Sequence, residues 1–129
     1  MSTQSIELRV RYKETDQMGF VYYSNYLVWF EIARTEYFRK QGLVYKTIEQ
    51  ERGLYLPVVD AYCRYRVPVR YDEVVIVEVG IKEMKASRIV FEYKVKVEGK
   101  TVASGTTTHA FINKEGQPVA IPEDIKAKL

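Results

Sequence analysis

The chain has 129 residues, a formal net charge of +3 and 47% hydrophobic residues, which suits one domain, residues 1–129, with one hydrophobic core. It contains no long apolar run and no apolar leader at its start, so we expect a cytoplasmic protein without a membrane span. One cysteine and one histidine cannot form a disulfide or a Cys/His metal cluster, so no metal site is predicted. Charges of both signs are spread along the chain, without a basic stripe between aromatic residues, which disfavours a nucleic-acid partner.

The first part of the chain predicts a strand, a loop and a long helix. Residues 6–12 alternate between apolar and charged side chains, which is typical of a half-buried strand. Residues 13–23 show no sustained period and predict a loop. From Ser24 or Asn25 to Gly42, apolar residues recur at helical spacing over much of the circumference. Such a helix is expected to be enclosed by other elements.

The second part predicts a short helix over residues 45–51 and then strands rich in β-branched and aromatic residues. These strands span residues 56–66, 74–82, 88–97 and 101–112. Short turns join most of them, which indicates antiparallel pairing. The fold class is therefore α+β, an antiparallel sheet of about five strands wrapped around one long central helix. The pattern alone does not separate this fold from cystatin-like or nuclear-transport-factor-like sheets.

The loop before the helix is the candidate site for chemistry. The helix start near residues 22–25 offers backbone N–H groups without helical partners, which can polarise a carbonyl oxygen. Asp16 lies a short loop away and can serve as a nucleophile or a general base. Gly19 lets the intervening backbone turn closely. The residues alone leave an alternative open, in which Asp16 shapes the turn by hydrogen bonding its own backbone.

The other reactive side chains have structural interpretations. His109 lies inside a strand pattern without a paired acid or nucleophile, so we expect a structural role. Cys63 is expected to be a small buried hydrophobe. A turn between two strands contains Lys85, Ser87 and Arg88, which suit either phosphate binding or solvent exposure.

A family resemblance favours the catalytic interpretation of Asp16. The signature of 4-hydroxybenzoyl-CoA thioesterase and the related YbgC-type acyl-CoA thioesterases, which have the hotdog fold, is similar to "YKETDQMGFVYYSNYLVWFEIARTEYF". The resemblance continues through "RYDEVVIVEVGIKEMKASRIVFEY" and "THAFINKEGQPVAIPE", and so covers nearly the whole chain. It implies that Asp16 is the catalytic carboxylate and that the backbone N–H of Tyr23 polarises the thioester carbonyl. Many YbgC-type members have histidine at the position of Tyr23.

The same resemblance implies a binding site and an assembly. The nucleotide end of CoA would meet Lys85, Ser87 and Arg88, and the acyl pocket would be lined by Leu56, Pro57 and Val58. Because the latter three are apolar, a fatty or aromatic acyl group is favoured. The implied assembly is a homodimer whose sheets join edge to edge, commonly doubled to a tetramer, with acyl-CoA entering between subunits.

The predicted function is therefore an acyl-CoA thioesterase that uses no metal or organic cofactor, with coenzyme A as part of its substrate. The alternative is a non-catalytic hotdog protein that binds an acyl-CoA or an aromatic ligand. A hotdog dehydratase is disfavoured, because such enzymes pair a histidine with an acid and His109 lies far from Asp16 in the sequence.

Overall fold

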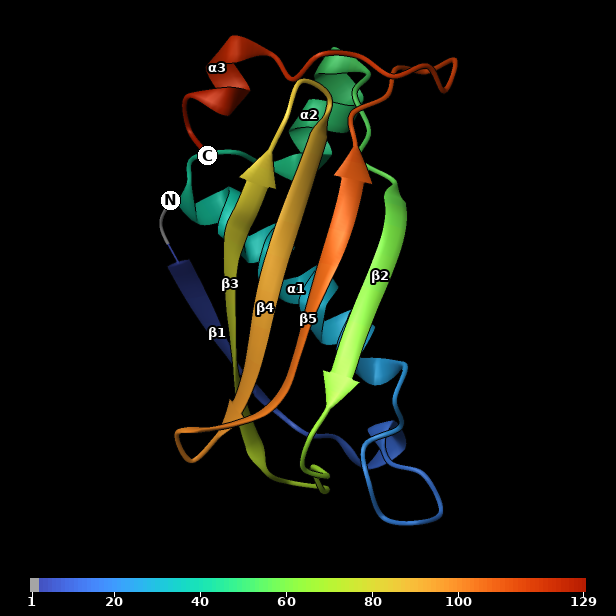
Figure 1. Cartoon of the computed structure of the whole chain (residues 1–129), viewed down its shortest axis with the longest axis vertical. Coiled ribbons are helices and arrows are strands. Elements are labelled where there is room, and N and C mark those ends of the chain that lie inside the picture. The colour runs from blue at the N-terminus through green and yellow to red at the C-terminus, as the bar shows by residue number, and fades with distance from the viewer. Residues whose placement is uncertain (1–2) are drawn as a thin grey trace.

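A computed structural model describes residues 3–129, which form a five-stranded antiparallel sheet in the order β1-β3-β4-β5-β2 (Figure 1). The strands are β1 (Thr3–Arg9), β2 (Val58–Tyr65), β3 (Val74–Met84), β4 (Arg88–Val97) and β5 (Lys100–Ala110). The helices are η1 (Tyr12–Glu14, a 3-10 turn), α1 (Asn25–Lys40), α2 (Tyr45–Arg52) and α3 (Glu123–Lys126). Helix α1 crosses one face of the sheet. Within these residues, no helix is long and apolar enough to cross a membrane.

The predicted order of elements is confirmed, and the largest difference lies in the first strand. That strand was expected over residues 6–12, but β1 ends at Arg9 and Tyr12 starts η1. Tyr12 continues the apolar alternation without being buried, since its side chain is 78% exposed and packs against the ring of Tyr71. The predicted strand was therefore too long, because the apolar alternation continues past Arg9 into the turn η1.

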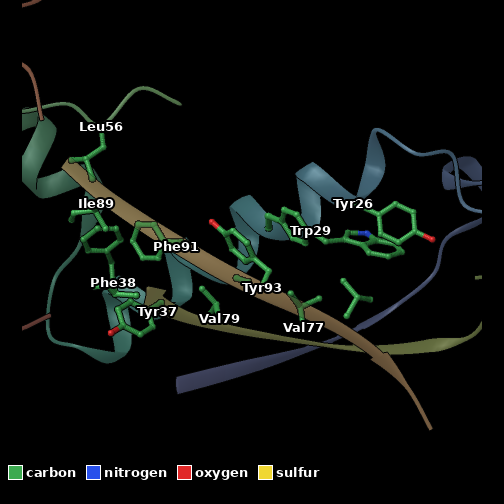
Figure 2. Close-up of a cluster of buried hydrophobic side chains, with 14 of the residues drawn as sticks. Tyr26, Trp29, Tyr37, Phe38, Leu56, Val77, Val79, Ile89, Phe91 and Tyr93 are labelled. Atoms are coloured by element: carbon green, nitrogen blue, oxygen red, sulfur yellow. The ribbon is translucent and has the colours of Figure 1, made fainter. Parts of the chain in front are cut away.

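The core lies between α1 and the sheet. Phe30 of α1 stacks on Tyr93 of β4, with ring centroids 4.1 Å apart. Gly105 of β5 permits this approach, because a Cβ atom there would lie 2.7 Å from the Phe30 ring and closer still to the Tyr62 carbonyl oxygen. Figure 2 shows Trp29 at one end of this core and Leu56 at the other.

The expected enclosure of the helix is only partly confirmed. Six residues of α1 are buried, namely Tyr26, Trp29, Phe30, Ala33, Tyr37 and Phe38. Leu27 and Val28 remain 38% and 45% exposed. Strand β2 forms one edge of the sheet, and all of its residues except Cys63 are exposed. The exposed side of α1 and the β2 edge therefore leave apolar surface uncovered in the single chain.

Candidate active site

The loop that carries Asp16 is closed by backbone hydrogen bonds. The Asp16 N–H donates to the Phe20 carbonyl at 2.8 Å, and the Gly19 N–H donates to the Asp16 carbonyl at 3.0 Å. Gly19 has φ +83°, a conformation that side chains beyond glycine rarely adopt. Thr15 and Val21 form an isolated antiparallel bridge at the base of the loop. The loop is thus a tight turn with Asp16 near its start.

The Asp16 carboxylate uses its two oxygens differently. Oδ1 accepts hydrogen bonds from the backbone N–H groups of Met18 at 2.9 Å and Phe20 at 3.2 Å. Oδ2 receives no hydrogen bond from residues 3–129. The turn-forming interpretation of Asp16 is therefore correct for one oxygen. The side chain is half-buried and lines a groove, so the second oxygen remains available for chemistry.

The backbone N–H groups just before α1 lack acceptors. Tyr22 donates to the Glu14 carbonyl at 2.8 Å and Asn25 donates to the Tyr22 carbonyl at 3.0 Å, whereas neither Tyr23 nor Ser24 donates to any described residue. Ser24 occupies the N-cap position but its side chain makes no capping bond. Two donors at the positive end of the helix dipole are thus free to bind an oxygen atom.

Tyrosines form the walls of this groove, which has a volume of about 340 Å³. The Tyr65 hydroxyl donates to the Tyr23 carbonyl at 3.0 Å and so fixes the orientation of that peptide. Partial burial raises the pKa of Tyr65, which keeps this phenol protonated as a donor. The rings of Tyr26 and Tyr65 meet edge to face at 4.9 Å. The groove therefore combines apolar aromatic walls with Asp16 and with Tyr23, whose backbone N–H is a free donor.

Glu14 attaches the loop to the helix, and nothing in its local sequence predicted this role. Its Oε2 accepts from the Trp29 indole N–H at 2.9 Å and its Oε1 accepts from the Arg11 backbone N–H at 2.8 Å. Burial opposes ionisation of Glu14, but these hydrogen bonds and the Arg11 side chain outweigh it and hold its pKa below the ordinary value. The one tryptophan of the sequence was the available signal, because a buried indole N–H needs an acceptor.

The residues predicted for the acyl pocket lie at the other end of the chain's core. Leu56 is buried, while Pro57 and Val58 are exposed at the start of β2. None of them lines the groove of Asp16. In Figure 1, β2 runs from this end towards the loop region that carries Asp16. Within one chain, the structure therefore does not bring the predicted pocket residues to Asp16.

The predicted CoA-binding residues lie in the turn between β3 and β4. Lys85 is exposed and its ammonium group lies 2.8 Å from the carboxylate of Glu83. Ser87 is half-buried, and Arg88 begins β4 with an exposed side chain. This turn is at the Leu56 end of the molecule (Figure 1). A role in binding CoA stays a prediction for these residues.

His109 has the buried structural position expected for it, whereas Cys63 was expected to be buried and is only half-buried. His109 is fully buried in β5, and Nδ1 lies 3.1 Å from the Leu56 carbonyl oxygen. Cys63 is half-buried in β2, and burial raises the pKa of its thiol. Neither side chain lines the groove of Asp16. In the described part of the chain, no group of three or more His, Cys, Asp or Glu side chains could hold a metal ion.

Known proteins with related sequences and folds identify the class of this chain. The profile of the thioesterase-like superfamily matches residues 10–129. The putative acyl-CoA thioesterase YneP of Bacillus subtilis is 36% identical over 116 residues, which cover 89% of this chain and 83% of that protein. The acyl-CoA thioesterase YbgC of Haemophilus influenzae is 33% identical over 124 residues, which cover 95% and 91%. The DHNA-CoA thioesterase of Staphylococcus aureus superposes with a TM-score of 0.94 at 31% identity, covering 99% of this chain and 89% of that one.

The chain therefore belongs to the thioesterase-like superfamily. The predicted resemblance to YbgC-type thioesterases is confirmed by sequence, and the predicted hotdog fold is confirmed by the superposition over nearly the whole chain.

Proposed function

We propose that this protein hydrolyses acyl-CoA thioesters to a free acid and coenzyme A in the groove of Asp16. The observation that carries the proposal is the unpartnered N–H group of Tyr23, a residue that lines the same groove as a carboxylate with one free oxygen. The names of the relatives YneP and YbgC support the same reaction. No metal ion or organic cofactor is needed for it, and that part stays a prediction.

The geometry assigns a role to each group. The thioester carbonyl oxygen accepts a hydrogen bond from the Tyr23 N–H, and a donor of this kind stabilises the developing oxyanion by about 3 kcal/mol. Asp16 Oδ2 then acts by one of two routes. It attacks the carbonyl carbon, so that the C–S bond breaks, the thiolate leaves and water hydrolyses the mixed anhydride. Alternatively, it removes a proton from the water molecule that attacks the carbon.

The complete site is proposed to need a second copy of the chain. Strand β2 is an exposed edge that carries apolar side chains such as Val59 and Tyr62. If two copies pair antiparallel through this strand, the Leu56 end of one subunit lies beside the Asp16 end of the other. This pairing unites the predicted pocket and CoA-binding residues with the groove. A monomeric mass in sedimentation equilibrium would contradict it. A doubled dimer and a cytoplasmic location stay predictions.

Replacement of Asp16 tests the reaction. Asp16→Asn keeps the size of the side chain and an oxygen for the bonds from Met18 and Phe20, but it removes the nucleophile or base. We expect the release of free thiol from acyl-CoA to fall by about 10³-fold or more in kcat. Unchanged circular dichroism and an unchanged Kd for the same acyl-CoA would show that fold and binding persist.

Asp124→Asn is a matched control, because it is the same substitution at an exposed residue of α3 that pairs with Arg52 and does not line the groove of Asp16. Its kcat should stay close to that of the wild type. If folded Asp16→Asn retains near-normal turnover, Asp16 has no catalytic role. If the wild type binds acyl-CoA to saturation without releasing thiol across a panel of chain lengths, the protein is a binding module.

Isotope labelling identifies the nucleophilic route when water attacks the aspartyl carbon of the mixed anhydride. In a single turnover in H₂¹⁸O with excess enzyme, general-base catalysis places ¹⁸O in the released acid. Nucleophilic attack by Asp16 instead leaves ¹⁸O in the protein carboxylate when water attacks the aspartyl carbon, and in the acid when water attacks the acyl carbon. Mass spectrometry of the peptide that contains Asp16 detects the first of these outcomes.

A further inference from the structure

A second cavity lies at the Leu56 end of the core, between α1, α2 and β5. It has a volume of about 350 Å³ and is lined by Glu31, Arg34, Phe38, Tyr45, Leu56 and His109. The rings of Phe38 and Tyr45, with centroids 6.0 Å apart, form an apolar wall. Figure 2 shows Phe38 and Leu56 together at this end of the core. The cavity thus has room for a small acyl chain or ring beside several polar groups.

A chain of hydrogen bonds begins at Arg34 and ends at Leu56, which both line this cavity, and its direction is settled by these two ends. Arg34 can only donate, and its Nη1 lies 3.4 Å from the Tyr93 hydroxyl. The Leu56 carbonyl can only accept, so His109 donates to it from Nδ1. Because burial lowers the pKa of His109 to about 4, its Nε2 carries no proton and accepts from Thr107 at 2.8 Å. Thr107 therefore accepts from the Tyr93 hydroxyl at 2.6 Å.

The direction of the chain decides what the cavity can offer to a ligand. The hydrogens of Tyr93, Thr107 and the His109 ring are all committed within it. Arg34 is the exception, because it has five N–H donors and only the long contact to Tyr93 among the described residues. No carboxylate of residues 3–129 lies within 4.0 Å of its guanidinium group. Half-buried Arg34 therefore faces the cavity with unused donors and a positive charge.

The remaining polar groups of the cavity are fewer and differently placed. The hydroxyls of Thr35 and Tyr45 also line it, and the Tyr45 oxygen accepts from the Leu56 N–H at 2.8 Å. Each hydroxyl can donate one hydrogen bond. Glu31, one turn before Arg34, is exposed and supplies the one carboxylate of the lining. The side-chain donors of the lining with unused hydrogens are therefore Arg34, Thr35 and Tyr45, of which Arg34 has the most and carries the positive charge.

We propose that this cavity receives the far end of the acyl group and that Arg34 makes it selective for acyl groups with an oxygen acceptor at that end, a carbonyl or a carboxylate. The proposal rests on the thioesterase function and on antiparallel pairing through β2, which places this cavity beside the groove of Asp16 in the other subunit. The sequence predicted an apolar acyl pocket lined by Leu56, Pro57 and Val58. In this proposal the pocket instead has a cationic end. A guanidinium group binds carbonyl and carboxylate oxygens strongly because its hydrogen bonds carry charge.

The test compares hexanoyl-CoA, 5-oxohexanoyl-CoA and adipoyl-CoA, which have acyl chains of six carbons and differ at the far end. The wild type should hydrolyse at least one of the oxygenated substrates with a kcat/KM about 10- to 100-fold above that of hexanoyl-CoA. A preference for 5-oxohexanoyl-CoA alone would show that the cavity binds a neutral carbonyl. A preference for adipoyl-CoA alone would show that it binds a carboxylate. Either result supports the proposal.

Variants then assign the preference to one side chain. In Arg34→Met, the ratio of the oxygenated to the plain substrate should fall to about one, because the shape is retained and the donors are lost. Arg34→Lys keeps the charge and serves if Arg34→Met does not fold, and its ratio should lie between those of the wild type and one. Arg39→Met is the matched control on the same helix, since Arg39 is exposed and paired with Glu36, and its ratio should equal that of the wild type.

Two results would overturn the proposal. One is equal kcat/KM for all three substrates in the wild type, and the other is an unchanged ratio in folded Arg34→Met. Failure of the thioesterase function itself is distinguishable, because then no substrate releases thiol. In that case calorimetric titration of the wild type with the same three compounds still measures selectivity, and equal Kd values would overturn the proposal.

Discussion

Glu14 and His109 are both buried titratable side chains, at opposite ends of the core, and they are held in opposite charge states. Glu14 accepts hydrogen bonds from an indole and a backbone N–H, which keep its pKa below the ordinary value and the carboxylate ionised. His109 has one acceptor and one hydroxyl as partners, and burial lowers its pKa to about 4. The hydrogen-bond partners available at each end, and not burial alone, therefore decide whether a buried group is charged.

The same comparison separates two tasks in the molecule. Glu14 attaches the loop of Asp16 to α1 through Trp29. His109 holds the Leu56 carbonyl at the start of the segment that leads into β2. One end therefore places the groups proposed for the reaction, and the other shapes the cavity proposed for the acyl group. If each buried polar group stabilises the fold through its hydrogen-bond partners, the effect of replacing it should depend on those partners.

The largest effect is expected at Glu14. Glu14→Ala leaves the Trp29 indole N–H and the Arg11 backbone N–H without their acceptor, so the free energy of unfolding should fall by about 3 kcal/mol. Turnover should fall as well, because the loop of Asp16 loses its side-chain bond to Trp29 and keeps only the bond from the Asn25 side chain to the Glu14 carbonyl as a direct hydrogen bond between Glu14 and α1. Urea denaturation and the thiol-release assay measure the two effects.

The control for Glu14 is Glu36→Ala on the outer side of α1. Glu36 pairs with Arg39 at 3.5 Å in solvent, and such a pair contributes less than about 1 kcal/mol. If the free energy of unfolding falls equally in both variants, the buried contacts of Glu14 stabilise the fold no more than an exposed ion pair does.

The next effect is a pH dependence that differs between the two ends. The pKa of His109 falls from 6.5 in the unfolded chain to about 4 when folded, so the unfolded state binds its proton first as the pH drops. Stability from the neutral imidazole is complete above pH 6.5 and is lost towards pH 4, by about 3 kcal/mol at most. Glu14 has a lowered pKa, so its contribution is present above its ordinary value of 4.5 and is lost below it.

Urea denaturation between pH 8 and pH 4 measures this dependence. His109→Asn keeps a donor near the Leu56 carbonyl but has no group that titrates in this range. The decline between pH 6.5 and 4.5 should therefore be much smaller in the variant than in the wild type. An equal decline in both proteins would assign it to other groups.

The sequence predicted the fold better than it predicted the contacts that hold the site. Strand β4 spans the residues that alternate most regularly, because period-two burial is a local property. The local sequence also predicted free donors over residues 22–25 beside Asp16, from a polar loop that precedes a helix, whereas the family resemblance selected Tyr23 and gave Asp16 its catalytic role. The roles of Glu14 and Arg34 depend on partners that lie 15 and 59 residues away, and no local pattern reports such pairs. The local sequence around a loop acid such as Glu14 or a helix cation such as Arg34 therefore does not show its structural or binding role.

The position of Leu56 shows a second kind of limit. Family resemblance assigned Leu56 and Lys85 to the same site as Asp16, but within one chain these residues lie at the opposite end (Figure 1). Sequence similarity reports which residues serve a function without saying which copy of the chain supplies them. The exposed edge of β2 is the structural feature that would reconcile the two observations.

The smallest effect is expected at Tyr37, which differs from Glu14 and His109 because its buried polar atom has no hydrogen-bond partner. Its hydroxyl is buried and is the one such side-chain atom of residues 3–129 without a hydrogen-bond partner. Tyr37→Phe removes an unsatisfied polar atom and keeps the ring against Phe91, so stability should be unchanged or rise by up to about 1 kcal/mol. Tyr93→Phe removes a hydroxyl bonded to Thr107 and should lower stability by about 1–2 kcal/mol. Equal losses in the two variants, measured by urea denaturation, would mean that the Tyr37 hydroxyl has a bound partner such as water. The expected difference follows from the rule drawn from the two ends of the core: a buried polar group stabilises the fold only through the partners that satisfy it.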